Sequence, residues 1–218
     1  MHADHLTGAA LHKKAYPEAE TGIGAKVTEV QATFAKLFNL DGEFKTDGSQ
    51  FCRLFEDGDT FSIGSMEARV IHTPGHTPAC VTYVIGDACF TGDTVFMPDF
   101  GSARCDFPGG SAEKLYDSVQ RILGLPASTR VFVGHDYQPG GRELKVESTV
   151  EEELRENKHL HEGTKMEEFV SWRTERDATL GAPKLLLPSL QVNLRNGQLP
   201  PAESNGTVYM KIPINALG

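Results

Sequence analysis

The sequence lacks any long apolar stretch. No segment approaches the roughly 18 consecutive apolar residues of a membrane-spanning helix, and the opening MHADHLTG is polar, unlike the apolar centre of a secretory signal peptide. These absences argue against a membrane partner and favour a cytoplasmic location. The 218 residues are 39% hydrophobic, which is enough for a substantial core.

Basic residues and cysteines are also scarce. There are 21 lysines and arginines against 30 aspartates and glutamates, a formal net charge of −9. Because phosphate binding needs concentrated positive charge, we expect no nucleic-acid partner. The four cysteines contain no C-x-x-C pair, which excludes a zinc ribbon and predicts reduced, mostly buried thiols. They are Cys52, Cys80, Cys89 and Cys105.

Short β-rich runs broken by turn residues are abundant. Between Phe51 and Phe96 such runs predict a meander of four or five antiparallel strands. Two helical patterns precede it at 6–16 and 25–40, separated by the glycine-rich TGIGA. A further helix is expected from Ser111 to Leu123, because Ser111 can cap it and apolar residues recur on one face.

The C-terminal third has weaker patterns. RVFVGHD predicts one more buried strand, and the acidic sequence past Thr149 predicts two helices. We expect the run from Glu151 to Glu153 to form a solvated helix face. The tail from Leu185 has no clear period, so we expect it to wrap over the surface.

Potential metal ligands stand where predicted strands end. His76 in HTPGHT, Asp93 in FTGD and His135 in FVGHD each follow an apolar run and a glycine. Taken singly, such residues are commonly hydrogen-bonded structure or turn residues. Three more candidates open the chain: His2, Asp4 and His5. Together the six predict a site assembled from loops at one sheet edge.

These residues occur in the order of the metallo-β-lactamase family, which the sequence resembles. The family signature H-x-H-x-D-H is followed by a distant histidine, a bridging aspartate and a last histidine. His2, Asp4 and His5 match its third, fifth and sixth positions, and the first histidine would lie immediately upstream of Met1. The resemblance implies an α/β fold, an αββα sandwich of two sheets with helices outside.

Longer segments resemble one branch, the glutathione persulfide dioxygenases or sulfur dioxygenases, especially bacterial ones. They are HTPGHTPACVTYVIGDACFTGDTVF, FGSARCDFPGGSAEKLYDSVQRIL, VFVGHDYQPGGRE and LPSLQVNLRNGQLPP. The resemblance implies oxidation of glutathione persulfide, a low-molecular-weight persulfide, by O2 to sulfite and glutathione. One Fe(II) per chain would be held by the first histidine of the signature, His76 and Asp93, a triad that leaves coordination positions open.

The remaining signature residues have two interpretations. In the dioxygenases, His2, Asp4, His5 and His135 would orient ligands or hydrogen-bond the substrate. In zinc hydrolases of the same fold, such as the glyoxalase II enzymes, the same positions hold two Zn(II) per chain and activate a hydroxide. Ligand identity alone does not separate the two, so a binuclear thioester hydrolase stays open.

Three further residues are candidates for substrate contact. Arg104 can bind a carboxylate of glutathione through its guanidinium fork, or form a structural ion pair with Asp106 or Asp99. Tyr137 is close enough in sequence to the last histidine to line the same pocket. Cys105 is a candidate persulfide carrier, although a small buried cysteine needs no function. We expect His72 to be a turn residue, and the remaining histidines to occupy surface positions of helices: His12, His159 and His161.

The family strands that precede the H-x-H-x-D-H loop are absent from this sequence. We therefore expect Met1 to be an internal methionine, and 1–218 to form a single metallo-β-lactamase-like domain lacking its first strands. Its metal-site core would span 1–147, and C-terminal helices with a wrapping tail 148–218. An inactive truncated remnant is the third hypothesis. The expected partners are a small-molecule thiol persulfide and O2, and a homodimer stays open.

Overall fold

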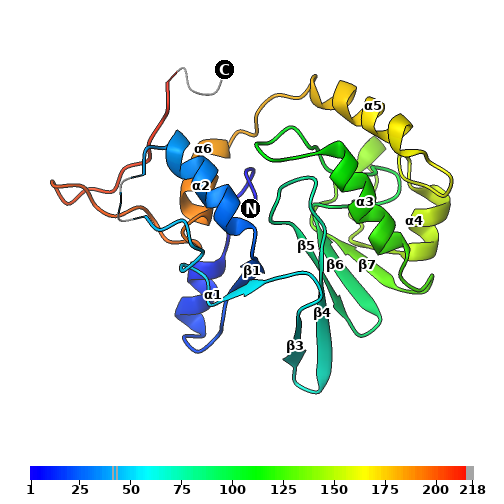
Figure 1. The fold of residues 1–218 in the computed structure, drawn as a ribbon, viewed down its shortest axis with the longest axis horizontal. Coiled ribbons are helices and arrows are strands. Elements are labelled where there is room, and N and C mark those ends of the chain that lie inside the picture. Colours follow the sequence, from blue (N-terminus) through cyan, green and yellow to red (C-terminus); the bar gives the residue numbers. More distant parts are fainter. Residues whose placement is uncertain (41, 43, 215–218) are drawn as a thin grey trace. The chain divides into compact units, whose positions relative to one another are not determined.

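The computed structural model describes residues 1–40, 42 and 44–214 (Figure 1). Contacts divide the chain into two compact units: Met1–Leu54 with Gly181–Gly218, and Phe55–Leu180. The single-domain organisation expected for residues 1–218 stays a prediction, and each unit is described by itself. Within the described ranges, no helix is both long enough and apolar enough to span a bilayer.

A six-stranded sheet forms the centre of the second unit. In spatial order its strands are β3 (Thr60–Ile63), β4 (Met66–His72), β5 (Val81–Ile85), β6 (Ala88–Gly92), β7 (Arg130–Val133) and β8 (Glu147–Thr149). Neighbours pair antiparallel except β6 and β7, which run parallel. The predicted meander and the strand in RVFVGHD are confirmed. β8 is not among the predicted strands, because three residues are too short to show a period.

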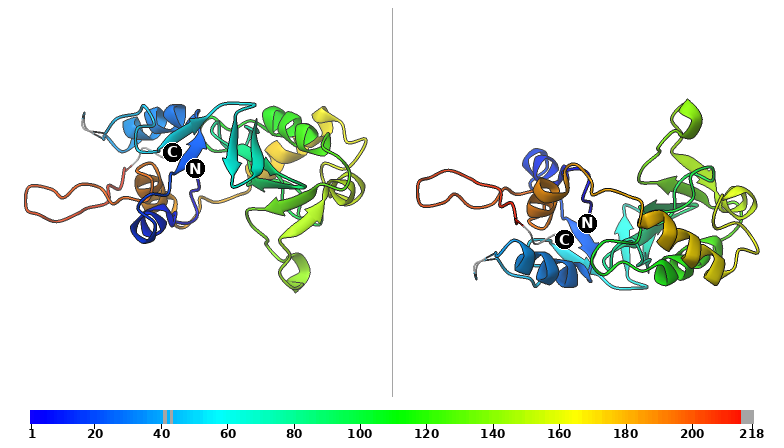
Figure 2. Two further views of the ribbon diagram at one scale, coloured as in Figure 1. Left: turned by 90° about the horizontal axis from the view of Figure 1, so that it is seen from below. Right: turned by 90° about the horizontal axis from the view of Figure 1, so that it is seen from above.

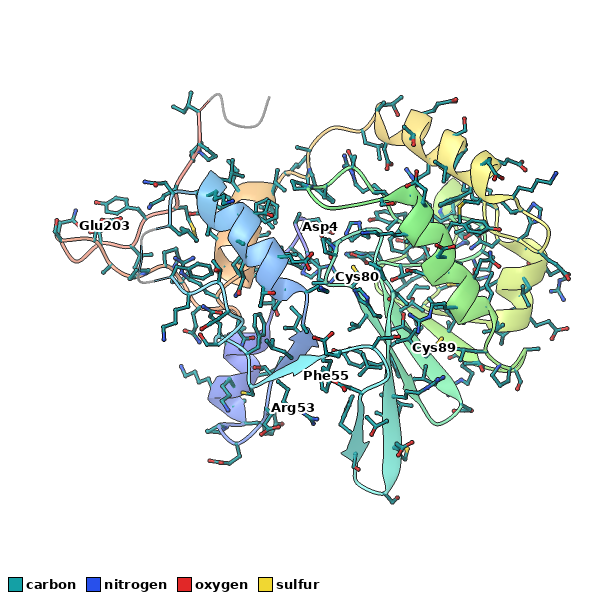
Figure 3. The ribbon with its side chains drawn as sticks, in the orientation of Figure 1. Asp4, Arg53, Phe55, Cys80, Cys89 and Glu203 are labelled. Atoms are coloured by element: carbon teal, nitrogen blue, oxygen red, sulfur yellow. The ribbon has the colours of Figure 1, made fainter. Side chains whose placement is uncertain are left out.

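Three helices pack on one face of this sheet (Figure 1): α3 (Ala112–Leu123), α4 (Val150–Glu156) and α5 (Met166–Asp177). Apolar side chains of the helices join those of the strands in one core, which includes Leu115 of α3 and Cys89 and Val131 of the sheet. Cys89 is labelled in Figure 3. The predicted start of α3 is confirmed, since Ser111 Oγ accepts the backbone N–H of Lys114.

The acidic run in α4 is not wholly solvated, so that prediction is wrong at one position. Glu151 and Glu152 are exposed, but Glu153 is fully buried. Its carboxyl accepts hydrogen bonds from Ser148 Oγ at 2.6 Å and Asn157 Nδ2 at 2.8 Å. Burial raises the pKa of Glu153 to about 7. Consecutive helix positions point in different directions, so an acidic triplet need not share one face.

The first unit combines both ends of the chain. Its elements are α1 (Ala9–Ala15), β1 (Gly22–Gly24), α2 (Val27–Leu37) and α6 (Leu186–Asn193), and β1 pairs with β2 (Arg53–Phe55). Both predicted N-terminal helices are confirmed. The prediction for the tail is wrong in part, because α6 forms within it and buries Leu190 and Val192. The buried residues of α6 include Ser189, Gln191 and Asn193, so the helix has no apolar stripe to detect. Tail residues 215–218 lie outside the described part.

Candidate metal centre

His76 lies in the loop that joins β4 to β5. Two contacts hold this loop against α3. Ser118 Oγ donates to the carbonyl of Pro74 at 2.6 Å, and a Cβ at Gly75 would lie 2.4 Å from the Cα of Leu115. Only glycine permits so close an approach of the loop to the helix backbone. Helix packing therefore determines where His76 lies.

The ring of His76 has a defined orientation. Its Nδ1 lies 2.8 Å from the backbone oxygen of Arg104, and a carbonyl only accepts hydrogen bonds, so Nδ1 carries the hydrogen. In the neutral imidazole, Nε2 then has the lone pair. Nε2 lies 3.9 Å from Oδ2 of Asp93, too far for a hydrogen bond. Two lone-pair-bearing atoms thus face one another, as the ligands of a shared cation do.

Asp93 and His135 follow neighbouring parallel strands, so they emerge at the same edge of the sheet. Asp93 comes directly after Gly92, whose positive φ of 53° turns the chain at the end of β6. His135 follows β7, and its Nδ1 lies 2.7 Å from Oδ1 of Asp93. At Gly134 a Cβ would lie 2.6 Å from that same oxygen. Glycine is therefore required beside the carboxylate.

The donor set of this edge suits a divalent metal. Two imidazoles and one carboxylate are ligands that iron and zinc both accept. His76 and Asp93 are 8% and 7% exposed, and each histidine has its Nδ1 hydrogen engaged, as in outer-shell arrangements that orient metal ligands. Oδ1 of Asp93 is engaged by His135, which leaves Oδ2 towards His76. The structure thus brings together the three strand-end candidates.

The opening candidates form a cluster of their own in the first unit. Ligand atoms of His2, Asp4 and His5 all lie within 4.8 Å of one another, and Figure 3 labels Asp4 on the segment that precedes α1. Asn193 of α6, 4% exposed, holds this segment. Its Nδ2 donates to the carbonyls of His2 and His5 at 2.9 Å each, and its Oδ1 accepts the N–H of Thr7 at 2.8 Å.

Arg104 makes the structural ion pair that was one of its two expected roles. Its Nε and Nη2 donate to the two carboxylate oxygens of Asp106 at 2.6 and 2.5 Å. The guanidinium also lies 4.9 Å from the ring centroid of Phe107, and that ring packs edge-on to His76. The side chain of Arg104 is thereby held near His76, and its contact with substrate stays a prediction.

Cys105 is a buried thiol. Its backbone N–H donates to Oδ2 of Asp177 at 2.7 Å, and Asp177 forms a buried ion pair with Arg173. Burial raises the pKa of the Cys105 thiol. A protonated, buried sulfur is a poor nucleophile, so this environment favours a packing role over persulfide transfer.

Tyr137 extends from the edge beside His135. The two rings lie 5.9 Å apart, and Tyr137 is 53% exposed. Sequence reasoning missed the rings that pack against it, Phe96 and Phe100, and it missed Arg142, which binds the neighbouring Asp136. Their only signal is an arginine in the glycine-rich PGGRE and phenylalanines in VFMPDF, neither of which has a recognisable spacing.

Two of the other histidines, His72 and His159, have structural environments, whereas His12 and His161 are exposed. Nε2 of His72 lies 2.8 Å from the carbonyl of Pro78, as its expected turn role requires. His159 was expected on a helix surface, and that prediction is wrong. It lies in a turn, stacked 3.4 Å from Trp172, and burial lowers its pKa to about 4. The contact with an aromatic side chain of α5 supplies the burial that a local pattern does not show.

Comparison with known proteins agrees with the signature. Residues 1–135 match the sequence model of the metallo-beta-lactamase superfamily. The chain belongs to this superfamily. The metallo-β-lactamase fold expected from the sequence is thereby confirmed, with its sheet and its covering helices.

Relatives within the superfamily have two kinds of name. The chain is 55% identical to "Glyoxylase B2" of Dictyostelium discoideum over its full length and 75% of that protein. It is 34% identical to the mitochondrial persulfide dioxygenase ETHE1 of Bos taurus, over 92% of the chain and 68% of that protein. The crystal structure of ETHE1 from Myxococcus xanthus matches with a TM-score of 0.71 at 29% identity, covering 90% of this chain and 74% of the other. The expected kinship with persulfide dioxygenases is confirmed.

Proposed function

We propose that this protein oxidises glutathione persulfide with O2 to sulfite and glutathione, using one Fe(II) per chain. In balanced form, glutathione persulfide, O2 and water give glutathione, sulfite and two protons. The observation that carries the proposal is the orientation of His76 and Asp93, whose Nε2 and Oδ2 face one another at 3.9 Å. The similarity to ETHE1 proteins in sequence and structure supports the choice of reaction.

In this proposal His76 and Asp93 hold the metal. The iron supplies the redox chemistry that combines O2 with the persulfide sulfur. His135 orients the carboxylate of Asp93 by donating from Nδ1 at 2.7 Å. This bond engages one carboxylate oxygen, and the other, on the side of His76, would be available to hold the metal. The roles of His2, Asp4 and His5 follow the family resemblance alone.

The substrate carries its charge at a distance from the reacting sulfur. Arg104 is the proposed contact for a glutathione carboxylate, since its guanidinium can rearrange from Asp106 to a substrate anion. Tyr137 is the proposed contact beside His135. We assign Cys105 no covalent part, because its thiol is buried.

A second function is a binuclear zinc hydrolase acting on thioesters. It is favoured by the 55% identity to the protein named "Glyoxylase B2" and by the clustering of His2, Asp4 and His5 within 4.8 Å. In that case two zinc ions would activate a hydroxide. The two functions differ in metal, in co-substrate and in product, so one set of measurements separates them.

The test is metal analysis of the protein purified without oxygen, followed by oxygen uptake with glutathione persulfide. We expect about one iron per chain and uptake matched by sulfite, from the single-site geometry. Asp93→Asn should lose both the bound iron and the oxygen uptake. The loss should exceed the roughly 10- to 100-fold effect seen when a residue that only hydrogen-bonds to a metal ligand is changed. His72→Gln is the matched control, because His72 ends β4, just before the loop of His76, and its ring contacts a backbone carbonyl.

Two zinc ions per chain with thioester hydrolysis and no oxygen uptake would overturn the proposal in favour of the hydrolase. Absence of bound metal together with absence of both activities would support the third hypothesis, a non-catalytic protein. If Asp93→Asn and His72→Gln lose bound iron and oxygen uptake equally, the losses reflect damage to the structure near the site rather than removal of a metal ligand.

A further inference from the structure

Arg142 lies between two carboxylates and binds both. Its Nε and Nη2 donate to Oδ2 and Oδ1 of Asp99 at 2.5 and 2.8 Å. Its Nη1 and Nη2 donate to Oδ2 and Oδ1 of Asp136 at 2.7 and 2.8 Å. One guanidinium therefore makes two bidentate ion pairs. All three of its nitrogens bind carboxylate oxygens, whereas a single bidentate pair engages two of them.

The two carboxylates belong to different loops at the edge of the sheet where Asp93 and His135 emerge. Asp99 lies in the loop after β6, and Asp136 directly follows His135 in the connection from β7 to β8. The side chain of Asp136 is 0% exposed and also accepts the N–H groups of Gln138 and Lys145. Figure 2 shows this connection extending away from the sheet. Arg142 thus links two loops that are distant in sequence.

The linked loops carry a group of aromatic rings next to His135. We call Phe96, Phe100 and Tyr137 the aromatic shelf. Tyr137 stacks on Phe100 with ring centroids 4.5 Å apart and meets Phe96 edge-on at 5.5 Å. The ring of His135 lies 6.3 Å from Phe96. The contacts of Tyr137 with Phe96 and Phe100 join one loop to the other, as Arg142 does.

We infer that Arg142 is a positioning residue that holds the aromatic shelf together, and that the shelf receives the peptide part of the persulfide's thiol carrier. This inference rests on the proposed function and adds the residues that would bind the peptide part of glutathione persulfide. Tyr137 is 53% exposed, so part of its ring offers an apolar surface against which a planar amide group can pack. Such a contact lies away from the reacting sulfur, so it governs binding and orientation of the substrate.

The test compares two persulfides that differ only in the peptide part. Glutathione persulfide has two amide planes and cysteine persulfide has none. In Arg142→Met, KM for glutathione persulfide should rise about tenfold, the equivalent of one aromatic stacking contact. We expect kcat to stay within about twofold and KM for cysteine persulfide to be unchanged, because binding remote from the reaction is lost.

Two milder variants show whether the change in KM comes from loss of the Arg142 contacts or from misfolding. The side chain of Asp99 is 46% exposed. Asp99→Asn therefore removes one of the two ion pairs of Arg142 and leaves the pair with Asp136 in place. We expect a smaller rise in KM, and Arg142→Lys should fall between it and Arg142→Met. Arg130→Met is the matched control. Arg130 makes a bidentate pair with Glu147 between β7 and β8 and does not touch the shelf residues.

Two measurements without turnover complete the experiment. Backbone hydrogen exchange of residues 97–101 should accelerate in Arg142→Met and Asp99→Asn but not in Arg130→Met. Calorimetry should show glutathione binding about tenfold more weakly to Arg142→Met than to the unaltered protein.

Equal KM changes for both persulfides, or unchanged glutathione binding, would overturn the inference. Failure of the proposed function is a separate outcome, recognised by the absence of oxygen uptake in the unaltered protein. In that case the exchange and binding measurements still decide whether Arg142 holds a shelf that binds a peptide thiol.

Discussion

The helix-covered face of the six-stranded sheet and the loop edge at its strand ends are held by different interactions. On the face, fully buried apolar side chains pack together, among them Leu115, Val119 and Val131. At the edge, directional hydrogen bonds dominate: His76 to the Arg104 carbonyl and His135 to Asp93. Apolar burial is non-directional and supplies stability, whereas hydrogen bonds of this kind define atom positions.

The two regions meet at glycines. Gly75 lets the loop of His76 lie against the backbone of α3, and Gly134 leaves room for the carboxylate of Asp93. At these two positions the backbone approaches its neighbours so closely that any side chain would clash with them. The comparison teaches that a change on the face should alter stability, and a change at the edge should alter metal binding. Four variants test this division.

Leu115→Ala should have the largest effect. Deleting a fully buried leucine side chain costs about 2–5 kcal/mol of unfolding free energy. The contact of Gly75 is with the Cα, Cβ and N of Leu115, all of which alanine keeps. Urea unfolding should therefore show the loss while metal content per folded chain is unchanged. Exposed Leu144→Ala is the control. A drop in the metal content of folded Leu115→Ala would contradict the expected separation of stability from metal binding.

Glu153→Gln should change how stability depends on pH. A buried carboxyl with a raised pKa contributes stability that is complete below its ordinary pKa of 4.5 and is lost as pH rises towards 7. We expect the unaltered protein to lose roughly 2–3 kcal/mol across this range and Glu153→Gln to lose much less. Urea unfolding at pH 5 and pH 8 measures this. Exposed Glu151→Gln should behave as the unaltered protein does.

Gly134→Ala tests the edge. The added methyl would lie 2.6 Å from Oδ1 of Asp93 and 2.9 Å from the backbone of Gly92. Displacing the carboxylate should weaken metal binding about 10- to 100-fold and alter unfolding free energy less than Leu115→Ala does. Metal titration into the metal-free protein gives the affinity. Gly124→Ala, where the nearest atom is 3.4 Å away, should bind metal normally.

Ser111→Ala should have the smallest effect. Loss of the hydrogen bond from the N–H of Lys114 to Ser111 Oγ removes the cap of α3 and should cost about 1 kcal/mol. Thermal unfolding should detect this, with metal affinity unchanged. Ser171→Ala on α5 is the control, since exposed Ser171 donates its hydroxyl to Glu175 one turn along the same helix. A larger loss of metal affinity than of stability would show that the cap also positions the loop of His76.

Much of the edge could be anticipated because each strand end carries a local mark. A glycine follows an apolar run before Asp93 and before His135, and the chemistry of the ligands is evident from their type. Arg142 has no such mark. Its partners, Asp99 and Asp136, are set by the meeting of two loops, and an arginine near several aspartates does not specify which it binds.

The same distinction separates the sequence from the tertiary structure as a whole. Periodicity, caps and turn residues act over a few positions, so the sequence alone determined the strand meander, α3 with its cap and the strand ends that bear His76, Asp93 and His135. Which side chains are buried depends on contacts between distant segments. Only the tertiary structure decided that Glu153 lies inside, that α6 forms in the tail, and that Arg142 joins two loops, because these outcomes depend on packing and long-range hydrogen bonds.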